Sequence, residues 1–157
     1  VAVGGTFDHL HPGHKLLLSC TALAGMGNII VGVVDDKLLV NKKYASQVEP
    51  YAVRQAQVTQ FLNMFAPGRE VLVEPLLDAF GPAATEKDLD VLVATVETEA
   101  NSSKVNDERA KHGLGPIAIE LIHVISSTSA EEVDITSKLS STAIRAWFHQ
   151  RDGNGGA

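Results

Sequence analysis

The chain has 157 residues, of which 45% are hydrophobic and 20% are charged, and its formal net charge is −6. A chain of this size and composition is typical of one soluble globular domain, which buries roughly two thirds of its unfolded surface and needs no disulfide or metal to fold. The acidic balance argues against a non-specific nucleic-acid binder, because such proteins meet phosphates with clustered lysine and arginine.

The single cysteine, Cys20, cannot form an internal disulfide, which favours a reducing, cytoplasmic location. No apolar run approaches the ~20 residues of a membrane-spanning helix and no stretch resembles a signal peptide, so we expect no membrane association. The sequence opens directly on the apolar run Val1–Val3. We therefore expect a trimmed chain, from which any targeting segment or partner domain would have been lost.

The first part of the sequence predicts two strands separated by one helix. Residues 1–4 form a short apolar run, and residues 29–34 form a nearly continuous one, typical of a strand buried on both faces of a parallel sheet. A helix is predicted over 12–24, with Pro12 in its first turn. Three residues at helical spacing are expected on its inward face: Leu16, Cys20 and Leu23.

The rest of the chain continues this alternation. Three more strands are predicted at 70–73, 90–95 and 116–124. Helices are predicted from Pro50 to the Pro67-Gly68 stop, over 97–112 before Gly113, and over 140–149. The last helix is expected to turn four residues inward: Leu139, Ala143, Ala146 and Trp147. The polar residues 126–137 predict a loop.

Repeated strand–helix order predicts an α/β fold, a Rossmann-like doubly wound parallel sheet of about five strands with helices on both faces. We expect residues 1–150 to form a single domain and residues 151–157 to form a flexible C-terminal tail. Ligands of such sheets bind beyond the carboxyl ends of the strands, at the point where the strand order reverses. The loop after the first strand is therefore the first place to look for a site.

The segment from Gly4 to His14, Gly-Gly-Thr-Phe-Asp-His-Leu-His-Pro-Gly-His, joins the first predicted strand to the first helix. Gly4 and Gly5 allow a tight turn and a close approach of the backbone to a ligand. Gly13 and His14 fall in the first helical turn, where free N–H groups and the helix dipole attract anions. His11 lies three residues before His14, so the two rings can share one face. The segment predicts an anion pocket with imidazole donors.

Other interpretations of this segment are open. It could be an ordinary strand-to-helix turn with exposed histidines, but the joint occurrence of G-T-F-D and H-x-G-H favours the anion pocket. His9, His11 and His14 could bind a metal, yet no cysteine lies nearby and all three rings would have to converge. The dinucleotide fingerprint G-x-G-x-x-G is absent, which argues against a nicotinamide or flavin dehydrogenase.

A second candidate segment, Lys138-Leu139-Ser140-Ser141-Thr142-Ala143-Ile144-Arg145, lies at the predicted start of the last helix. One of its three consecutive hydroxyl residues would cap the helix, and the others could hold phosphate oxygens together with free backbone N–H groups. Arg145, one turn further on, could add a charged donor. The alternative is an ordinary serine cap followed by a solvated arginine.

The loop after the second predicted strand carries Lys42 and Lys43. One of these lysines could reach over the pocket as a mobile charge, or both could be solvated. Four candidates are weaker. Arg54 could clamp a phosphate or be a surface charge, and Glu97 could contact a ligand or be a helix-start carboxylate. Asn106 and Arg109, three residues apart, could bind an anion or be solvated.

These segments resemble the nucleotidyltransferase superfamily, which is marked by H-x-G-H and I-S-S-T-x-x-R. Here the motifs are His11-Pro12-Gly13-His14 and Leu139-Ser140-Ser141-Thr142-Ala143-Ile144-Arg145, with leucine in place of isoleucine. Three further stretches resemble the eukaryotic and archaeal type of phosphopantetheine adenylyltransferase: Gly4–His11, Pro75–Ala83, and Val96-Glu97-Thr98 with Asn106-x-x-Arg109. Between Glu99 and Val105, the sequence Ala-Asn-Ser-Ser-Lys stands where members of that group tend to carry glycine.

The resemblance implies transfer of the adenylyl group of ATP to 4′-phosphopantetheine, giving dephospho-CoA and pyrophosphate. His14 and Lys42 would be the catalytic residues, with Lys42 preferred to Lys43 from its spacing to Pro50-Tyr51. ATP would be bound by Gly5, Thr6, Phe7, His11, Gly13, His14, Glu97, Ser140, Ser141, Thr142 and Arg145. The acceptor would be bound by Thr6, Asp8, Lys42, Asp78, Asn106 and Arg109. Mg²⁺ would arrive with ATP, and no metal site formed by the protein is implied.

Alternatives to this function stay open. The acceptor could be nicotinamide mononucleotide or another phosphate, or the chain could be a non-catalytic nucleotide-binding module. Cytidylyltransferases usually carry R-T-E-G-I-S-T-T as their second motif, and this sequence does not contain it. The sequence also leaves open whether a dephospho-CoA kinase is fused to this domain or works beside it.

Overall fold

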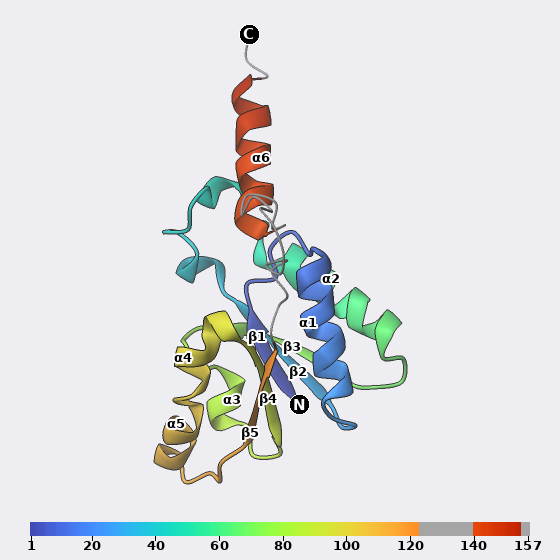
Figure 1. Cartoon of the computed structure of the whole chain (residues 1–157), viewed down its shortest axis with the longest axis vertical. Helices are drawn as coiled ribbons and strands as arrows, with labels where there is room; N and C mark the ends of the chain where they lie inside the picture. The colour runs from blue at the N-terminus through green and yellow to red at the C-terminus, as the bar shows by residue number, and fades with distance from the viewer. Residues whose placement is uncertain (123–139, 155–157) are drawn as a thin grey trace, which may run out of the picture.

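The computed structural model describes residues 1–122 and 140–154 and places five parallel strands in one sheet (Figure 1). The strands are β1 (Ala2–Gly5), β2 (Ile29–Val34), β3 (Val71–Leu76), β4 (Val91–Thr95) and β5 (Ala118–Ile122). Their order is β3-β2-β1-β4-β5, so the chain moves outward from β1 and then returns to its other side. The predicted α/β fold is confirmed, and its switch point lies between β1 and β4.

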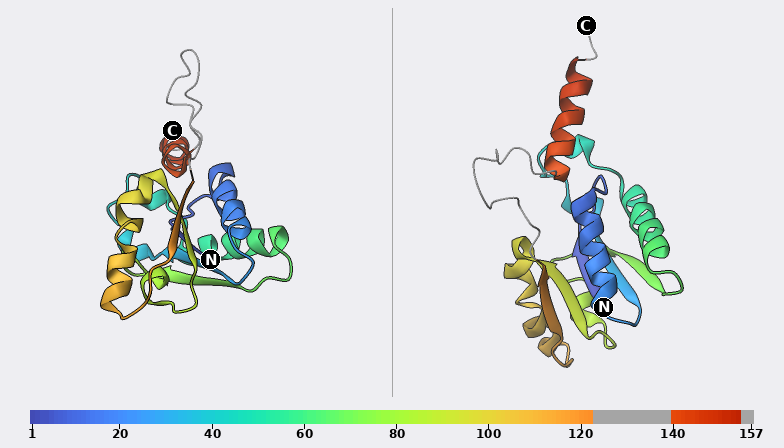
Figure 2. Two further views of the ribbon diagram at one scale, coloured as in Figure 1. Left: turned by 60° about the horizontal axis from the view of Figure 1, so that its bottom comes forward. Right: turned by 45° about the vertical axis from the view of Figure 1, so that its right-hand side comes forward.

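Helices cover both faces of the sheet (Figure 2). One face carries α1 (Pro12–Leu23) and α2 (Tyr51–Phe65). The other carries α3 (Pro82–Thr85), α4 (Glu99–Ser102) and α5 (Val105–Lys111). The 3₁₀ turns are η1 (Asp36–Leu38), η2 (Ala45–Gln47) and η3 (Val96–Thr98). Helix α6 (Ser141–Asn154) stands beyond the carboxyl ends of the strands and points away from the sheet (Figure 1).

Alternate residues of the central strands belong to two hydrophobic cores, one on each face of the sheet. The core under α1 and α2 includes Val3, Val31, Val93, Leu18 and Leu62. The core under α3 and α5 includes Ala2, Ile30, Leu92, Ala83 and Val105. Five of the six residues of β2 are buried, which confirms that its apolar run is covered on both faces.

The inward face of α1 differs from the prediction. Leu16 and Leu23, expected inward, are 47% and 78% exposed, whereas Leu17 and Leu18 are buried. The helix carries apolar residues on two adjacent stripes, so only its packing on the sheet selects the covered one. The covered stripe includes Thr21, whose hydroxyl donates to the Leu17 carbonyl (2.8 Å) and is thereby satisfied inside the core.

Helix α6 is longer than predicted and turned differently. It continues through residues 151–154, which the sequence predicts as tail. Ala143 and Trp147, predicted to face inward, are exposed, and Arg145 is buried instead. The ion pair of Arg145 described below explains this orientation. Leu139 lies outside the described residues.

The polar stretch predicted as one helix over 97–112 forms η3, α4 and α5 in succession. Thr98 Oγ1 accepts a hydrogen bond from the Thr95 N–H (3.1 Å). The hydroxyl of Ser102 donates to the Thr98 carbonyl (3.2 Å). Side-chain bonds of this kind compete with a regular helix, so the chain turns in short pieces around the carboxyl end of β4. Gly113, with φ 71, follows α5 as predicted.

Two further predictions concern the end of the sheet. β5 begins at Ala118, two residues after the predicted start of the strand over 116–124, and residues 123 and 124 lie outside the described part of the chain. The predicted loop over 126–137 also lies outside it.

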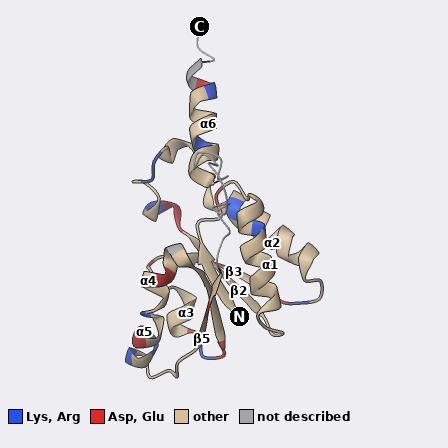
Figure 3. Cartoon of the chain, in the orientation of Figure 1, with Lys and Arg blue, Asp and Glu red and all other residues tan. Residues whose placement is uncertain are grey.

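Charged residues are distributed along the ribbon in both signs (Figure 3). The segment between β2 and α2 begins with Asp35 and Asp36 and carries Lys37, Lys42 and Lys43 further on. Within the described residues, no helix combines the length and the apolar character that crossing a membrane requires.

Leu76, at the end of β3, fills a space left by glycines of two neighbouring strands. A Cβ added at Gly32 would lie 2.5 Å from Leu76 Cδ2, and one added at Gly4 would lie 3.2 Å from Leu76 Cδ1. Gly81, from the loop that follows, closes the same space. Because these glycines have no side chains, Leu76 can lie across the sheet.

We predict that Gly32→Ala lowers the free energy of unfolding by about 1–3 kcal/mol, because the new methyl group displaces Leu76 from a packed position. Urea denaturation followed by circular dichroism measures the loss. Gly27→Ala is the matched control, since an added Cβ there meets no atom within 4 Å. Equal stability of the two variants would contradict the packing argument.

Candidate active site

A tight turn follows β1, and glycine is required in it for a steric reason. A Cβ added at Gly5 would lie 3.0 Å from the ring of Phe7. Phe7 is fully buried and has φ 51, while His9 has φ 48. Both values lie in the left-handed region, which costs energy for residues other than glycine. The surrounding contacts must therefore hold the Thr6–His9 turn in place.

The H-x-G-H residues build the start of α1 as one unit. Nδ1 of His11 accepts a hydrogen bond from the Gly13 N–H (3.2 Å) and caps the helix, and Pro12 occupies its first position. A Cβ added at Gly13 would lie 3.1 Å from His11 Cε1, so only glycine lets the ring fold back. The ring of His14 stacks on that of His11, with centroids 3.8 Å apart. Because Nδ1 of neutral His11 is an acceptor, its proton lies on Nε2.

His14 is a neutral group at physiological pH. Burial, helped by the neighbouring His11, lowers the pKa of His14 from 6.5 to about 4, although Asp8 acts in the opposite direction. Burial also lowers the pKa of His11. Nδ1 of His14 is buried and has no hydrogen-bond partner among the described residues, so Nε2 is the nitrogen left for a ligand. The pair can donate hydrogen bonds to an anion without carrying charge.

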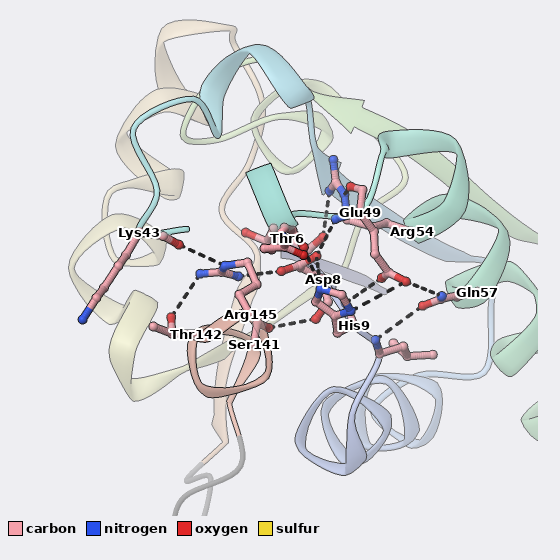
Figure 4. A network of polar contacts seen from close by, with 12 residues as sticks. Thr6, Asp8, His9, Lys43, Glu49, Arg54, Gln57, Ser141, Thr142 and Arg145 are labelled. Atoms are coloured by element: carbon pink, nitrogen blue, oxygen red, sulfur yellow. Dashed lines mark hydrogen bonds and ion pairs between the residues drawn. The ribbon is translucent and has the colours of Figure 1, made fainter. Parts of the chain in front are cut away.

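The two motif segments meet through a buried ion pair, shown in Figure 4. Nη1 of Arg145 lies 2.5 Å from Oδ2 of Asp8, and the two side chains are 3% and 0% exposed. The other carboxylate oxygen of Asp8 accepts from the Glu49 N–H (2.9 Å). The hydroxyl of Ser141 donates to the Asp8 carbonyl (2.8 Å). The start of α6 is thus fixed against the turn that precedes α1.

The protein's own groups occupy the polar atoms of Asp8 and Arg145. The remaining nitrogens of Arg145 donate to the Lys43 carbonyl (3.1 Å) and to Thr142 Oγ1 (3.1 Å). All three guanidinium nitrogens therefore have protein partners, and both carboxylate oxygens of Asp8 are used as well. Because a buried charge needs a compensating partner, these two residues stabilise each other, and their expected ligand roles stay predictions.

A cavity of about 720 Å³ lies at the carboxyl ends of the strands, where the two helix starts converge. Its polar part is lined by Gly5, Thr6, Phe7, His11, Gly13, His14, Lys42, Ser140, Ser141, Thr142 and Arg145. Its apolar part lies toward α3 and α5 and is lined by Leu76, Phe80, Pro82, Ala83, Leu92 and Val105. Lys42 lines the cavity, whereas Lys43 contributes its carbonyl to Arg145. One space therefore joins an anion-binding end to an apolar chamber.

Asp78 lines the same cavity and shapes its rim. Its Oδ1 accepts hydrogen bonds from the N–H groups of Gly81 (2.7 Å) and Phe80 (2.8 Å). These bonds hold the pKa of the Asp78 carboxyl below its usual value. Gly81 has φ 51, so the loop depends on a glycine at this position.

Two of the predicted substrate contacts are placed elsewhere. Arg109 is 2% exposed and donates to the carbonyls of Gly115, Ala83 and Glu86 at 2.8–2.9 Å. Asn106 exchanges two hydrogen bonds with the backbone of Ile117 (3.0 and 2.9 Å). Neither lines the cavity, because both are used to fix the loop before β5. Glu97 lies in η3, and its side chain is outside the described residues.

Sequence reasoning missed several residues of the site. Four polar residues at or after the end of β4 line the cavity: Thr95, Thr98, Asn101 and Ser102. Their place after the strand beside the switch point was the signal that could have found them. Arg54, treated in the sequence as a ligand contact or a surface charge, is fully buried and contacts protein groups.

A possible metal cluster contains Asp8, His9 and Glu49, whose ligand atoms lie within 4.8 Å of one another. Asp8 is paired with Arg145, and Glu49 accepts from the His9 N–H (2.6 Å) and from Gln57 (2.9 Å). Nε2 of the His9 ring lies 2.8 Å from the Gln47 carbonyl oxygen. The three groups form a hydrogen-bonded structural cluster.

Comparison with known proteins gives a consistent result. Residues 2–147 match the family model described as Cytidylyltransferase-like. A phosphopantetheine adenylyltransferase of Saccharomyces cerevisiae is 40% identical over 144 residues, which are 92% of this chain and 47% of the yeast protein. A phosphopantetheine adenylyltransferase of Pyrobaculum aerophilum is 37% identical over 141 residues, which are 85% of this chain and 90% of that protein. The chain thus spans about half the length of the yeast relative.

Solved structures share the fold. A protein of unknown function from Archaeoglobus fulgidus has a TM-score of 0.69 and 28% identity, covering 85% of this chain and 98% of its own. A lipopolysaccharide core biosynthesis protein from Thermoplasma volcanium has a TM-score of 0.60 at 18% identity, covering 77% of this chain and 93% of its own, and shows the fold alone.

The low pKa of His14 predicts a pH dependence of stability. Since this pKa is about 4 in the folded chain and 6.5 ordinarily, the unfolded chain binds more protons between these values. The free energy of unfolding should decrease as the pH falls from 6.5 toward 4, and His14→Gln should make the decrease shallower. Proton NMR of the His14 ring should give a midpoint near 4, and a midpoint at 6.5 would contradict the burial argument.

The Asp8–Arg145 pair predicts a large, non-additive effect on stability. Arg145→Met leaves the Asp8 carboxylate buried without its cation and should cost about 3–5 kcal/mol in urea denaturation. Asp8→Asn combined with Arg145→Met should cost less than the sum of the two single changes. Arg151→Met, at a 59% exposed side chain, should change stability by less than about 1 kcal/mol. Simple additivity would show that the pair is not coupled.

Proposed function

This chain belongs to the Cytidylyltransferase-like family, in the group of its phosphopantetheine adenylyltransferase relatives, and we propose that it transfers the adenylyl group of ATP to 4′-phosphopantetheine. The products would be dephospho-CoA and pyrophosphate, in a step of coenzyme A biosynthesis. One observation carries the proposal: a single cavity joins an anion-binding end to an apolar chamber. The anion-binding end matches the triphosphate of ATP, and the apolar chamber matches the pantetheine arm of the acceptor.

The anion-binding end suits the triphosphate of ATP. The first turns of α1 and α6 both line the cavity, and the positive ends of their helix dipoles attract anions. His11 and His14 add neutral imidazole donors, and Ser140 to Thr142 add hydroxyl groups. Arg145 also lines this end and holds it together through Asp8 and Thr142.

The apolar chamber suits the pantetheine arm of the acceptor, a long chain with few charged groups. Leu76, Phe80 and Val105 line it from three different elements. Asn101 and Ser102 lie at its edge and could bond the amides of such an arm. Nicotinamide mononucleotide offers a charged ring and a ribose instead, which match these apolar walls poorly.

The chemistry requires placement and charge stabilisation. An oxygen of the acceptor phosphate forms a bond to the α-phosphorus of ATP. The bond between that phosphorus and the oxygen that bridges the α- and β-phosphates breaks. Pyrophosphate leaves with that electron pair. The attacking oxygen is already an anion, so no base has to remove a proton. Nε2–H of neutral His14 and the ammonium group of Lys42 would stabilise the charge that builds on the α-phosphate oxygens.

A magnesium ion bound to ATP would screen the charge of the triphosphate and ease the departure of pyrophosphate. The donor groups of the cavity fit an ion carried by the nucleotide. Asp78 is a carboxylate that lines the cavity, and its Oδ1 already accepts two N–H bonds. Most ligands of the ion would therefore come from phosphate oxygens and water. Dephospho-CoA would next be phosphorylated by a kinase, either fused to this domain or separate.

The proposal is tested by measuring pyrophosphate release from Mg-ATP with 4′-phosphopantetheine, with nicotinamide mononucleotide and with no acceptor. We expect release with 4′-phosphopantetheine, and dephospho-CoA as the product detected by chromatography. His14→Ala should lower kcat by ~10²–10³-fold, since it removes a transition-state donor. Circular dichroism of that variant controls for folding.

Two outcomes would overturn the proposal. Release only with nicotinamide mononucleotide would assign another acceptor. Nucleotide binding by calorimetry without release for either acceptor would indicate a binding module.

A further inference from the structure

Lys42 lies in the long connection between β2 and α2. We name residues 36–49 of this connection the Lys42 segment. Lys42 itself is exposed toward the cavity, and its N–H donates to the Leu39 carbonyl (3.0 Å). Leu39 is 4% exposed and anchors the first half of the segment. An exposed lysine can act on a reacting phosphate only if the backbone that carries it is fixed, so the attachments of this segment matter.

Arg54 of α2 lies beneath the segment and is 0% exposed (Figure 4). Its Nη2 lies 2.6 Å from Oδ1 of Asp36, at the start of the segment. Its Nε donates to the Glu49 carbonyl (2.8 Å), at the end of the segment. Its Nη1 donates to the Thr6 carbonyl (2.8 Å), in the turn after β1. One guanidinium therefore joins the two ends of the Lys42 segment to each other and to the turn after β1.

The charge balance supports a fixed geometry. The Asp36 side chain is 55% exposed, so Arg54 is fully buried beside a carboxylate that still reaches water. Burial alone would raise the pKa of the Asp36 carboxyl, but the Tyr51 N–H and the Arg54 guanidinium outweigh it and hold this pKa below its usual value. A lysine at position 54 would keep the charge but could not reach three acceptors in fixed directions.

We infer that Arg54 is a positioning residue for Lys42: by joining Asp36, Glu49 and Thr6, it sets where the Lys42 ammonium group meets the reacting phosphates. The inference rests on the proposed function, in which Lys42 stabilises the transition state. Arg145 holds the middle of the same segment through the Lys43 carbonyl, while Arg54 holds both of its ends. Arg54 does not line the cavity, so its effect on the reaction passes through the Lys42 segment or through the Thr6 turn.

The test compares Arg54→Lys with wild type by steady-state kinetics of dephospho-CoA formation. We expect kcat to fall on the order of 10²-fold, because a small displacement of a catalytic group costs about that much, with less than about a threefold change in the KM for ATP. Arg69→Lys is the matched control. Arg69 also donates to backbone carbonyls, those of Ala22 and Gly27, and lies outside the cavity. Its kcat should equal that of wild type.

A double-mutant cycle with Lys42→Ala separates positioning from general stability. If Arg54 acts through Lys42, Arg54→Lys should change kcat by less than about threefold once Lys42 is absent. An equal loss of kcat in both backgrounds would overturn the inference. So would an Arg54→Lys enzyme with wild-type kcat.

Hydrogen exchange supplies a readout that does not depend on catalysis. In Arg54→Lys, amides of residues 36–49 should lose protection while those of β1 and β4 keep it. Asp36→Ala is the second variant in case Arg54→Lys does not fold, since the Asp36 side chain is largely exposed. It should reproduce the loss of protection and lower kcat by about tenfold. Unchanged protection in both variants would overturn the inference, whereas a wild-type enzyme without adenylyl transfer would overturn the proposed function instead.

Discussion

The buried pairing of Asp8 with Arg145 is the interaction on which the rest of the site depends. The two residues are 137 positions apart in the sequence, and neither charge would be tolerated in the interior without the other. The pair brings the start of α6 to the turn that precedes α1, so two helix N-termini line one cavity. It also helps to hold Phe7 and His9 in left-handed backbone conformations that their side chains would otherwise disfavour.

The division of charge within the cavity follows from burial. His11 and His14 lie stacked against each other, and burial makes both weaker bases, so they donate hydrogen bonds as neutral rings. Arg54 and Arg109 do not line the cavity and bind backbone carbonyls, while Arg145 lines it and is paired with Asp8. Lys42 is exposed and lines the cavity, and its flexible stem can follow charge as it develops. Placement by hydrogen bonds and stabilisation by a mobile cation are thus supplied by different residues.

The two cores of the sheet explain why one cavity has two characters. Small residues of β1 and β2, including Gly4 and Gly32, leave room on the α3 side of the sheet, and Leu76 occupies part of it. The remaining apolar space opens beside the start of α1. Glycine is therefore needed in the turn and beside the chamber because a side chain would not fit there, as well as for its backbone freedom.

The sequence by itself determined the parts of this protein that rest on local interactions. The apolar run of β2 indicated a strand covered on both faces, and the His11, Pro12 and Gly13 pattern indicated a helix start, because the capping bond spans only two residues. Tertiary structure decided the rest. It selected which apolar stripe of α1 is covered, divided the 97–112 stretch, and buried Arg54, Arg109 and Arg145. An arginine on an amphipathic helix has the same sequence pattern whether solvated or buried; its role follows from acceptors such as the Thr6 carbonyl, 48 positions from Arg54, which only the folded chain brings within reach.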